Sequence, residues 1–150
     1  RGFLQAEALG AFLANTTASS LLRIHPVHKL MVSPVKRALQ TMAPTAKALG
    51  LRPLVRTNFF EAGGLYNADS TYSSFVAQGG MTRSEMMAAF SQYDLPDDIT
   101  EEGWYTGVGK ETDDECRERA TGIATELKML AGKLRESKQV VFVAHYDFMC

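Results

Sequence analysis

Hydrophobic residues along the chain alternate between helical spacing and short continuous runs. Apolar positions three and four apart predict a first helix from about Leu4, which ends in the polar stretch 15–20. The apolar run Leu30 to Val32 stops at Ser33-Pro34, as a buried strand does where it leads into a helix. A loop containing His25 and His28 is predicted before this strand. The front of the chain therefore predicts helix, loop and strand.

The same pattern continues through the next segment. Apolar residues at helical spacing predict a helix from Val35 to Leu49, and Gly50 stands where a left-handed C-terminal cap is expected. Residues 51–56 predict a second strand. The middle of the chain, 57–110, is rich in glycine and aromatic residues and shows little periodicity.

Two capping boxes mark later helices. Thr82 with Glu85 opens a short helix that we expect to end near Phe90, and Thr112 with Glu115 opens the longest helix. The predicted buried face of that helix consists of apolar residues at helical spacing: Cys116, Ala120, Ile123, Leu127, Leu130 and Leu134. Residues 139–144 predict a strand that is apolar on both faces, as strands covered on both sides by helices are. The predicted fold class is α/β, a mainly parallel sheet with helices on both faces.

Composition narrows the class of protein. The chain has 150 residues, 45% hydrophobic and 22% charged, which predicts one domain spanning 1–150. With a net charge of -1, the protein as a whole does not attract nucleic acid or an anionic membrane electrostatically. Cys116 and Cys150 form no metal-binding or disulfide pattern, and no apolar run is long enough to span a bilayer. A cytoplasmic protein without metal is expected.

The ends of the chain are unusual for a complete domain. The sequence opens at Arg1 directly on a helical pattern and stops at Cys150, one short step after a strand pattern. We therefore expect a fragment that is incomplete at both ends.

Polar side chains follow three of the predicted strands, at the edge where open parallel sheets bind ligands. Arg37 follows the first strand, Glu61 the second and His145 the last. Arginine offers a planar fork to phosphate oxygens, histidine adds a donor, and a carboxyl can pass a proton to a leaving oxygen. Each also fits a structural role, as a surface arginine, a loop carboxylate or a hydrogen-bonded histidine. Together they predict a phosphoryl-transfer site without a nucleophile.

These residues occur in a known order. The stretch 33–41 resembles the Ser-Pro-x-x-Arg-Ala-x-Gln-Thr signature of the histidine phosphatases of the phosphoglycerate-mutase-like kind. Residues 2–10 look like the helix after that family's first active-site loop, Glu61 with Gly63 looks like its acid loop, and 140–145 look like its second-histidine strand. Less specific matches at 61–64, 80–85 and 102–105 resemble a phosphatase subgroup.

The resemblance implies a mechanism. In this family a histidine in an Arg-His-Gly loop at the end of the first strand accepts the phosphoryl group, and water then hydrolyses the phosphohistidine. No Arg-His-Gly occurs in the sequence, so the first strand and the nucleophile are expected to be missing and this chain alone to be inactive. Arg37 and a charged His145 would hold phosphate without metal or cofactor, and Glu61 would transfer protons. Tyr146 replaces the family's usual glycine and keeps its amide available to substrate.

Three functions fit these residues. Hydrolysis of a small-molecule phosphomonoester is preferred over a phosphoglycerate-type mutase, because the acidic stretch from Asp94 to Glu102 disfavours a multiply anionic sugar phosphate. A non-catalytic module that binds inorganic phosphate or acts as a scaffold is the third. Only Arg83 and Lys110 supply positive charge in the variable middle region, so the sequence names no substrate and no oligomeric state.

Overall fold

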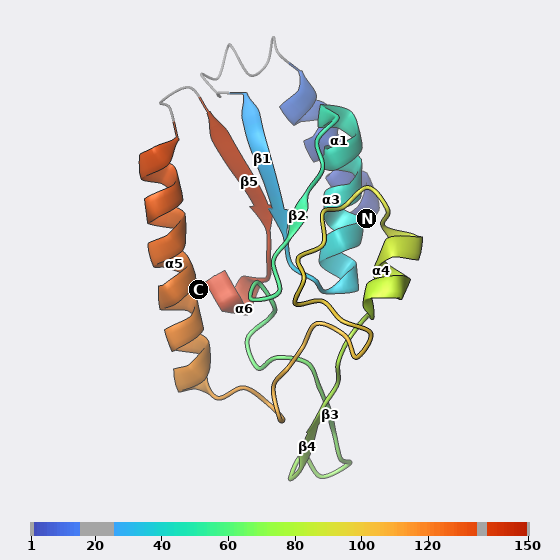
Figure 1. The fold of residues 1–150 in the computed structure, drawn as a ribbon, viewed down its shortest axis with the longest axis vertical. Helices are drawn as coiled ribbons and strands as arrows, with labels where there is room; N and C mark the ends of the chain where they lie inside the picture. The colour runs from blue at the N-terminus through green and yellow to red at the C-terminus, as the bar shows by residue number, and fades with distance from the viewer. Residues whose placement is uncertain (1, 16–25, 135–137, 150) are drawn as a thin grey trace.

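Three parallel strands form the central sheet, in the order β2-β1-β5 (Figure 1). The structure is a computed structural model that describes residues 2–15, 26–134 and 138–149. The elements, in chain order, are α1 Gly2–Ala14, β1 Val27–Val32, α3 Lys36–Leu49, β2 Leu54–Val55, β3 Tyr66–Ala68, β4 Phe75–Ala77, α4 Arg83–Ala89, α5 Asp113–Lys133, β5 Gln139–Val143 and α6 Tyr146–Met149. Strands β3 and β4 form a separate antiparallel hairpin. The α/β class with a parallel sheet is confirmed.

Strand β1 separates two hydrophobic clusters. Leu30 and Val32 belong to the cluster that includes the buried face of α3, whereas Met31 packs with Phe59 and with Ile123 of α5. This division follows from the geometry of a strand, in which successive side chains point to opposite faces of the sheet. Figure 1 shows α5 on one side of the sheet and α1 and α3 on the other. Helices therefore cover both faces, as predicted.

The two capping boxes and the glycine cap form as predicted. Thr82 and Thr112 each accept a hydrogen bond from the backbone of the glutamate three residues on, whose carboxylate bonds back. Gly50 ends α3 with a φ of 63°. The buried face predicted for α5 is half-buried, and only Ile123 is fully buried.

Some boundaries differ from the prediction. Strand β2 contains only two residues and begins after Pro53, which has no amide hydrogen for the ladder. Strand β1 begins at Val27, so the exposed His28 lies in a strand and not in a loop. His25 lies outside the described residues. None of the described helices is long and apolar enough to cross a membrane.

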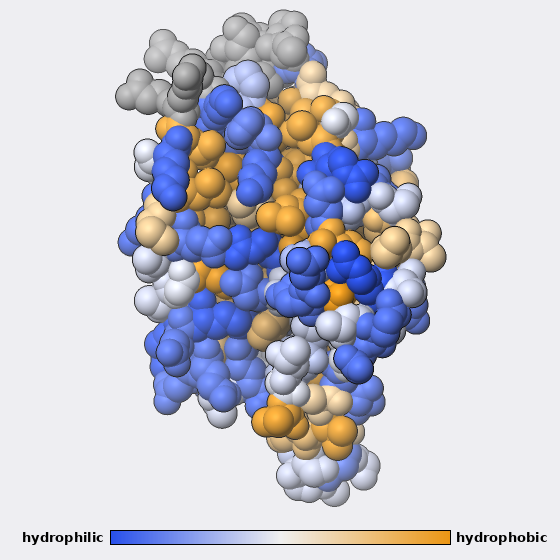
Figure 2. All heavy atoms as spheres, in the orientation of Figure 1, coloured by the Kyte–Doolittle hydropathy of each residue, from blue (hydrophilic) through white to orange (hydrophobic). Residues whose placement is uncertain are grey.

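Strand β5 lies at the edge of the sheet among the described strands. It pairs with β1 along its length, and Phe142 on it is 41% exposed although its ring packs edge-on against Phe59. Figure 2 shows hydrophobic side chains on this face of the molecule over the sheet and over the β3–β4 hairpin, where Val76 is also exposed. Part of the apolar surface predicted to be covered is thus open to solvent.

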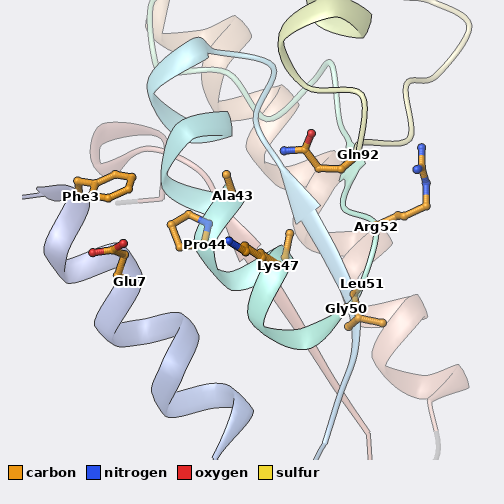
Figure 3. Close-up of a pocket in the computed structure, with 10 residues that line it drawn as sticks. Phe3, Glu7, Ala43, Pro44, Lys47, Gly50, Leu51, Arg52 and Gln92 are labelled. Carbon is orange, nitrogen blue, oxygen red and sulfur yellow. The ribbon is translucent and has the colours of Figure 1, made fainter.

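Helix α1 packs on α3 through its smallest residues. Ala6 and Gly10 are buried, whereas the large apolar residues of the predicted helical pattern, among them Leu4 and Phe12, are exposed. A Cβ atom built on Gly10 would lie 3.0 Å from the carbonyl oxygen of Pro44. Toward the start of α1 the two helices diverge and leave a hollow of about 570 Å³ (Figure 3). The pattern predicted the helix but not its buried face, because contact between two backbones selects small residues.

Gly10→Val should destabilise the protein, because the new side chain would press on the backbone of Pro44 and Thr45. We expect a loss of about 1 to 3 kcal/mol in the free energy of unfolding, as for other overpacked contacts. Gly122→Val in α5 is the matched control, since a Cβ there meets nothing within 4 Å, and it should change stability by less than about 0.5 kcal/mol. Chemical denaturation measures both, and equal effects would contradict the close contact of α1 with α3.

Candidate active site

The site residues meet because three strands end at the same level. Val32 of β1 pairs with Val55 of β2 on one side and with Val143 of β5 on the other. Arg37 lies in the first turn of α3 after β1, Glu61 in the loop after β2, and His145 between β5 and α6. The structure therefore brings Arg37, Glu61 and His145 together at the carboxyl edge of the sheet.

His145 is buried and hydrogen-bonded through both ring nitrogens. Its side chain is 3% exposed. Nε2 lies 2.7 Å from Ser33 Oγ, and Nδ1 lies 3.0 Å from a terminal nitrogen of Arg37. A guanidinium can only donate, so Nδ1 accepts from Arg37 and Nε2 carries the hydrogen donated to Ser33. These bonds fix a neutral imidazole in one tautomer.

Burial, the positive charge of Arg37 and, to a smaller extent, that of Arg119 lower the pKa of His145, while Glu61 acts in the opposite direction. A charged imidazole at this position was predicted from the resemblance. Desolvation and the neighbouring guanidinium both disfavour that charge, whereas a bound anion would favour it.

One carboxylate oxygen of Glu61 faces the site, and the other accepts hydrogen bonds from backbone amides. Oε1 accepts hydrogen bonds from the backbone amides of Ala62 and Phe148, at 3.1 and 3.2 Å. Oε2 lies 3.5 Å from Arg37 and 3.6 Å from Nδ1 of His145. The carboxyl group is therefore oriented by backbone donors while one oxygen stays beside the arginine and the histidine.

A cavity of about 660 Å³ opens beside Arg37 and Glu61. Its opposite wall comes from the β3–β4 hairpin and includes Tyr66, Asp69 and Tyr72. Among the described residues that line this cavity, Arg37 is the only lysine or arginine. The cavity next to Arg37 is therefore large enough for the part of a small substrate that carries the phosphate.

Asp69 carries a negative charge on the wall of this cavity. Its carboxylate accepts hydrogen bonds from the backbone and side chains of Thr71 and Ser73. These bonds, first of all the one from the backbone of Ser73, hold the pKa of Asp69 well below its ordinary value. The carboxylate is therefore ionised throughout the physiological range.

Several residues considered in the sequence do not reach this cavity. Tyr146 is 76% exposed and is not among its lining residues. The acidic stretch from Asp94 to Glu102 does not line it either, so the argument drawn from that stretch against a mutase is wrong. Asp94 pairs with Arg52 and Glu101 accepts from Ser84, which directs these carboxylates elsewhere.

The glycine pair after Glu61 makes a turn around an aromatic side chain. Gly63 and Gly64 have φ values of 89° and 79°, and a Cβ on Gly64 would overlap the hydroxyl of Tyr105. Met86 is buried in the core and Met87 is exposed.

Sequence reasoning missed three contributors to the site: Ser33, Asp69 and Phe148. Ser33 stands in the motif that the sequence singled out, and its Oγ also accepts from the amide of Val35. Asp69 and Phe148 reach the site through tertiary contacts that leave no local pattern. Within the described ranges, no group of three histidine, cysteine or acidic side chains is arranged to hold a metal ion.

The comparisons with known proteins bear on the family to which the chain belongs. A search of curated proteins finds no match to the chain. The family model described as the histidine phosphatase superfamily, branch 1, matches residues 1–150. Phosphatase or phosphomutase chemistry on small phosphorylated substrates is general in that superfamily. From its motifs, its parallel sheet and this match, the chain belongs to the histidine phosphatase superfamily, branch 1.

Proposed function

We propose that this site serves the hydrolysis of phosphomonoesters through a phosphohistidine, with Arg37 and His145 holding the phosphoryl group and Glu61 transferring protons. The observation that carries the proposal is the meeting of three groups: a guanidinium bonded to a buried imidazole at 3.0 Å, with a carboxylate oxygen 3.5 and 3.6 Å from the two. No other cluster of the described residues combines these chemistries beside a cavity.

Phosphate binding would rearrange the bonds of His145. Arg37 is 63% exposed and can turn its terminal nitrogens toward phosphate oxygens. The imidazole would then lose its donor at Nδ1, take up a proton beside the anion and donate from that nitrogen. Ser33 would keep the ring in place through its bond to Nε2. The two cationic donors would stabilise charge that develops on the phosphoryl oxygens.

Glu61 would act as general acid and then as general base. Protonated, it would give its proton to the leaving alkoxide, and afterwards it would take a proton from the attacking water. Its two backbone donors bind the oxygen that faces away from the site, which leaves Oε2 for this exchange.

The phosphate-accepting histidine is assigned to an Arg-His-Gly segment that is not among these 150 residues. His28 is exposed on β1. Nδ1 of His145, the ring nitrogen without a hydrogen, already accepts a hydrogen bond from Arg37. Neither is set to attack phosphorus, so the proposal concerns the complete catalytic unit and regards this chain alone as inactive.

Hydrolysis is preferred to phosphoryl return because of the charge on the cavity wall. A phosphoglycerate-type mutase must retain an intermediate that carries further anionic groups. The cavity offers Arg37 to the transferred phosphate, and its remaining charged lining residues in the described structure are Glu61 and Asp69. A substrate without a second anionic group suits this lining better.

Inorganic phosphate should bind between Arg37 and His145 with a chelator present. Arg37→Ala should weaken binding by about 10- to 100-fold, since a hydrogen bond to a charged group contributes about 1.5 to 3 kcal/mol. Arg52→Ala is the control, because Arg52 is similarly exposed and paired with a carboxylate away from the site. Isothermal titration calorimetry measures both, and loss of binding on chelation would contradict the proposal.

Sulfate affinity should rise as the pH falls below the ordinary histidine value of about 6.5. The pKa of His145 is lowered in the structure, and a bound dianion would raise it, so binding takes up a proton. Between the two pKa values affinity should increase by at most about tenfold per pH unit. Sulfate keeps its charge over this range, and His145→Gln should flatten the profile. A flat profile in the unchanged chain would refute proton uptake at His145.

The chain as it stands should form no acid-labile phosphohistidine with a labelled phosphomonoester, whereas the same chain extended before Arg1 by an Arg-His-Gly strand and loop should turn the substrate over. In the extended chain His145→Ala should raise the barrier by about 2 to 4 kcal/mol, as loss of an oxyanion donor does. Single-turnover kinetics and phosphorylation assays measure both. Phosphohistidine on the unextended chain would place the nucleophile among its own histidines.

A further inference from the structure

Arg119 is a largely buried arginine on α5 whose charge is paired with that of Glu111. Its side chain is 12% exposed and that of Glu111 is 8% exposed. Nε and one terminal nitrogen of Arg119 each donate to a different carboxylate oxygen of Glu111 at 2.7 Å. This two-point bond fixes the plane of the guanidinium.

The fixed guanidinium contacts two aromatic rings. Its Cζ is 3.6 Å from the centre of the Phe60 ring and 4.5 Å from the centre of the Phe148 ring. The remaining terminal nitrogen donates to the carbonyl oxygens of Asn58 and Phe60, at 2.9 and 3.1 Å. Arg119 thus ties the loop after β2 to helix α6, two segments far apart in the sequence.

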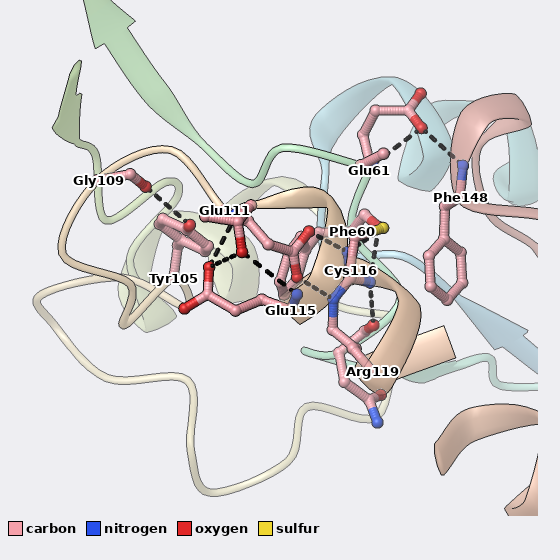
Figure 4. Close-up of polar contacts among 12 residues, drawn as sticks. Phe60, Glu61, Tyr105, Gly109, Glu111, Glu115, Cys116, Arg119 and Phe148 are labelled. Carbon is pink, nitrogen blue, oxygen red and sulfur yellow. Dashed lines mark hydrogen bonds and ion pairs between the residues drawn. The ribbon is translucent and has the colours of Figure 1, made fainter. Parts of the chain in front are cut away.

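Both of these segments flank Glu61. Phe60 directly precedes Glu61, and Phe148 gives its amide hydrogen to Oε1 of Glu61. Figure 4 shows Glu61 joined to the backbone of Phe148, with Phe60 and Arg119 beside them. Arg119 does not touch the carboxylate, but it holds the residue before it and the residue that orients it.

Neither segment is rigid by its own local structure. Glu61 lies in a loop outside the helices and strands, and α6 is four residues long, less than an isolated helix needs to be stable. The position of the carboxylate therefore depends on what fixes these segments to the rest of the fold. A misplacement of about 1 Å can cost a catalytic group most of its effect.

We propose that Arg119 is a positioning residue for Glu61, which acts through Phe60 and Phe148 to direct Oε2 toward the leaving-group oxygen. The inference rests on the proposed function of Glu61 as proton donor. Lysine cannot replace arginine here, because one ammonium group cannot stack flat on an aromatic ring while it bonds to a carboxylate at two points.

The test compares two leaving groups in the chain extended by an Arg-His-Gly segment. Alkyl phosphates need a proton on the departing oxygen, whereas p-nitrophenyl phosphate hardly does. Arg119→Lys keeps the positive charge near His145 and should lower the single-turnover rate of enzyme phosphorylation by the alkyl ester by about 10- to 100-fold, while the same rate with p-nitrophenyl phosphate changes less than about threefold. Glu61→Gln should show the same pattern more strongly.

Arg56→Lys is a matched control for the loss of an arginine. Arg56 also binds a glutamate of α5 at two points, Glu126 at 2.7 Å for both contacts, and lies 5.1 Å from the ring centre of Phe59. It contacts neither Phe60 nor Phe148, so the ratio of the two rates should not change even if stability falls. Glu111→Gln and Glu126→Gln form a milder pair should Arg119→Lys fail to fold.

A second measurement needs no turnover and uses the 150-residue chain. Glu61→Gln should shift the amide proton resonance of Phe148 in the otherwise unchanged chain, because that amide donates to the carboxylate. In the Arg119→Lys background the same substitution should shift it little, while the affinity for inorganic phosphate stays within about threefold because Arg37 and His145 are retained.

The outcomes are separable. If Glu61→Gln changes the rate ratio and Arg119→Lys does not, Arg119 has no positioning role. If Glu61→Gln leaves the ratio unchanged, the proposed function of Glu61 fails and the catalytic part of the inference fails with it. An undiminished response of the Phe148 amide in the Arg119→Lys background would overturn the structural part by itself.

Discussion

The pairing of Val32 with Val55 on one side and Val143 on the other brings the segments that carry Arg37, Glu61 and His145 to one edge of the sheet. In a parallel sheet the residues that follow the strands all lie at the same edge of the sheet. Because the last residues of these three strands pair with one another, the residues after them lie close together. A shift of one strand by a single residue would move His145 away from Ser33 and Arg37 and reverse the faces of the strand. Hydrophobic packing on both faces of β1 holds this register.

Charge in the site is balanced without any fully buried ion. Burial and Arg37 lower the pKa of His145 and so disfavour its charged form, and the arginine and glutamate beside it remain partly exposed. The desolvation cost of burying a charge is thus avoided until an anion arrives. Elsewhere the fold does bury a charge pair, Arg119 with Glu111, and there the guanidinium makes a hydrogen bond or ring contact in each direction.

Features with a local chemical cause could be predicted from the sequence, and those set by tertiary contacts could not. Helix caps such as Thr112 and Gly50 follow from backbone groups within one turn. The meeting of Arg37 and His145 follows from strand direction together with the recognised motif. The charge of His145 could not be predicted, because it depends on burial and on a guanidinium 108 positions away. The role of Arg119 is of the same kind, since its carbonyl partners lie 59 and 61 positions away in the chain.

The two faces of the sheet are covered unequally. Among the described residues, twelve buried side chains form the cluster on the α3 face, and three form the cluster between the sheet and α5. Local opening follows the weaker packing. Amide hydrogens of α5 should therefore exchange with solvent through partial unfolding, whereas those of β1 and α3 should exchange only through global unfolding. Since α5 carries Arg119, a partial opening of α5 would also release the loop that holds Glu61.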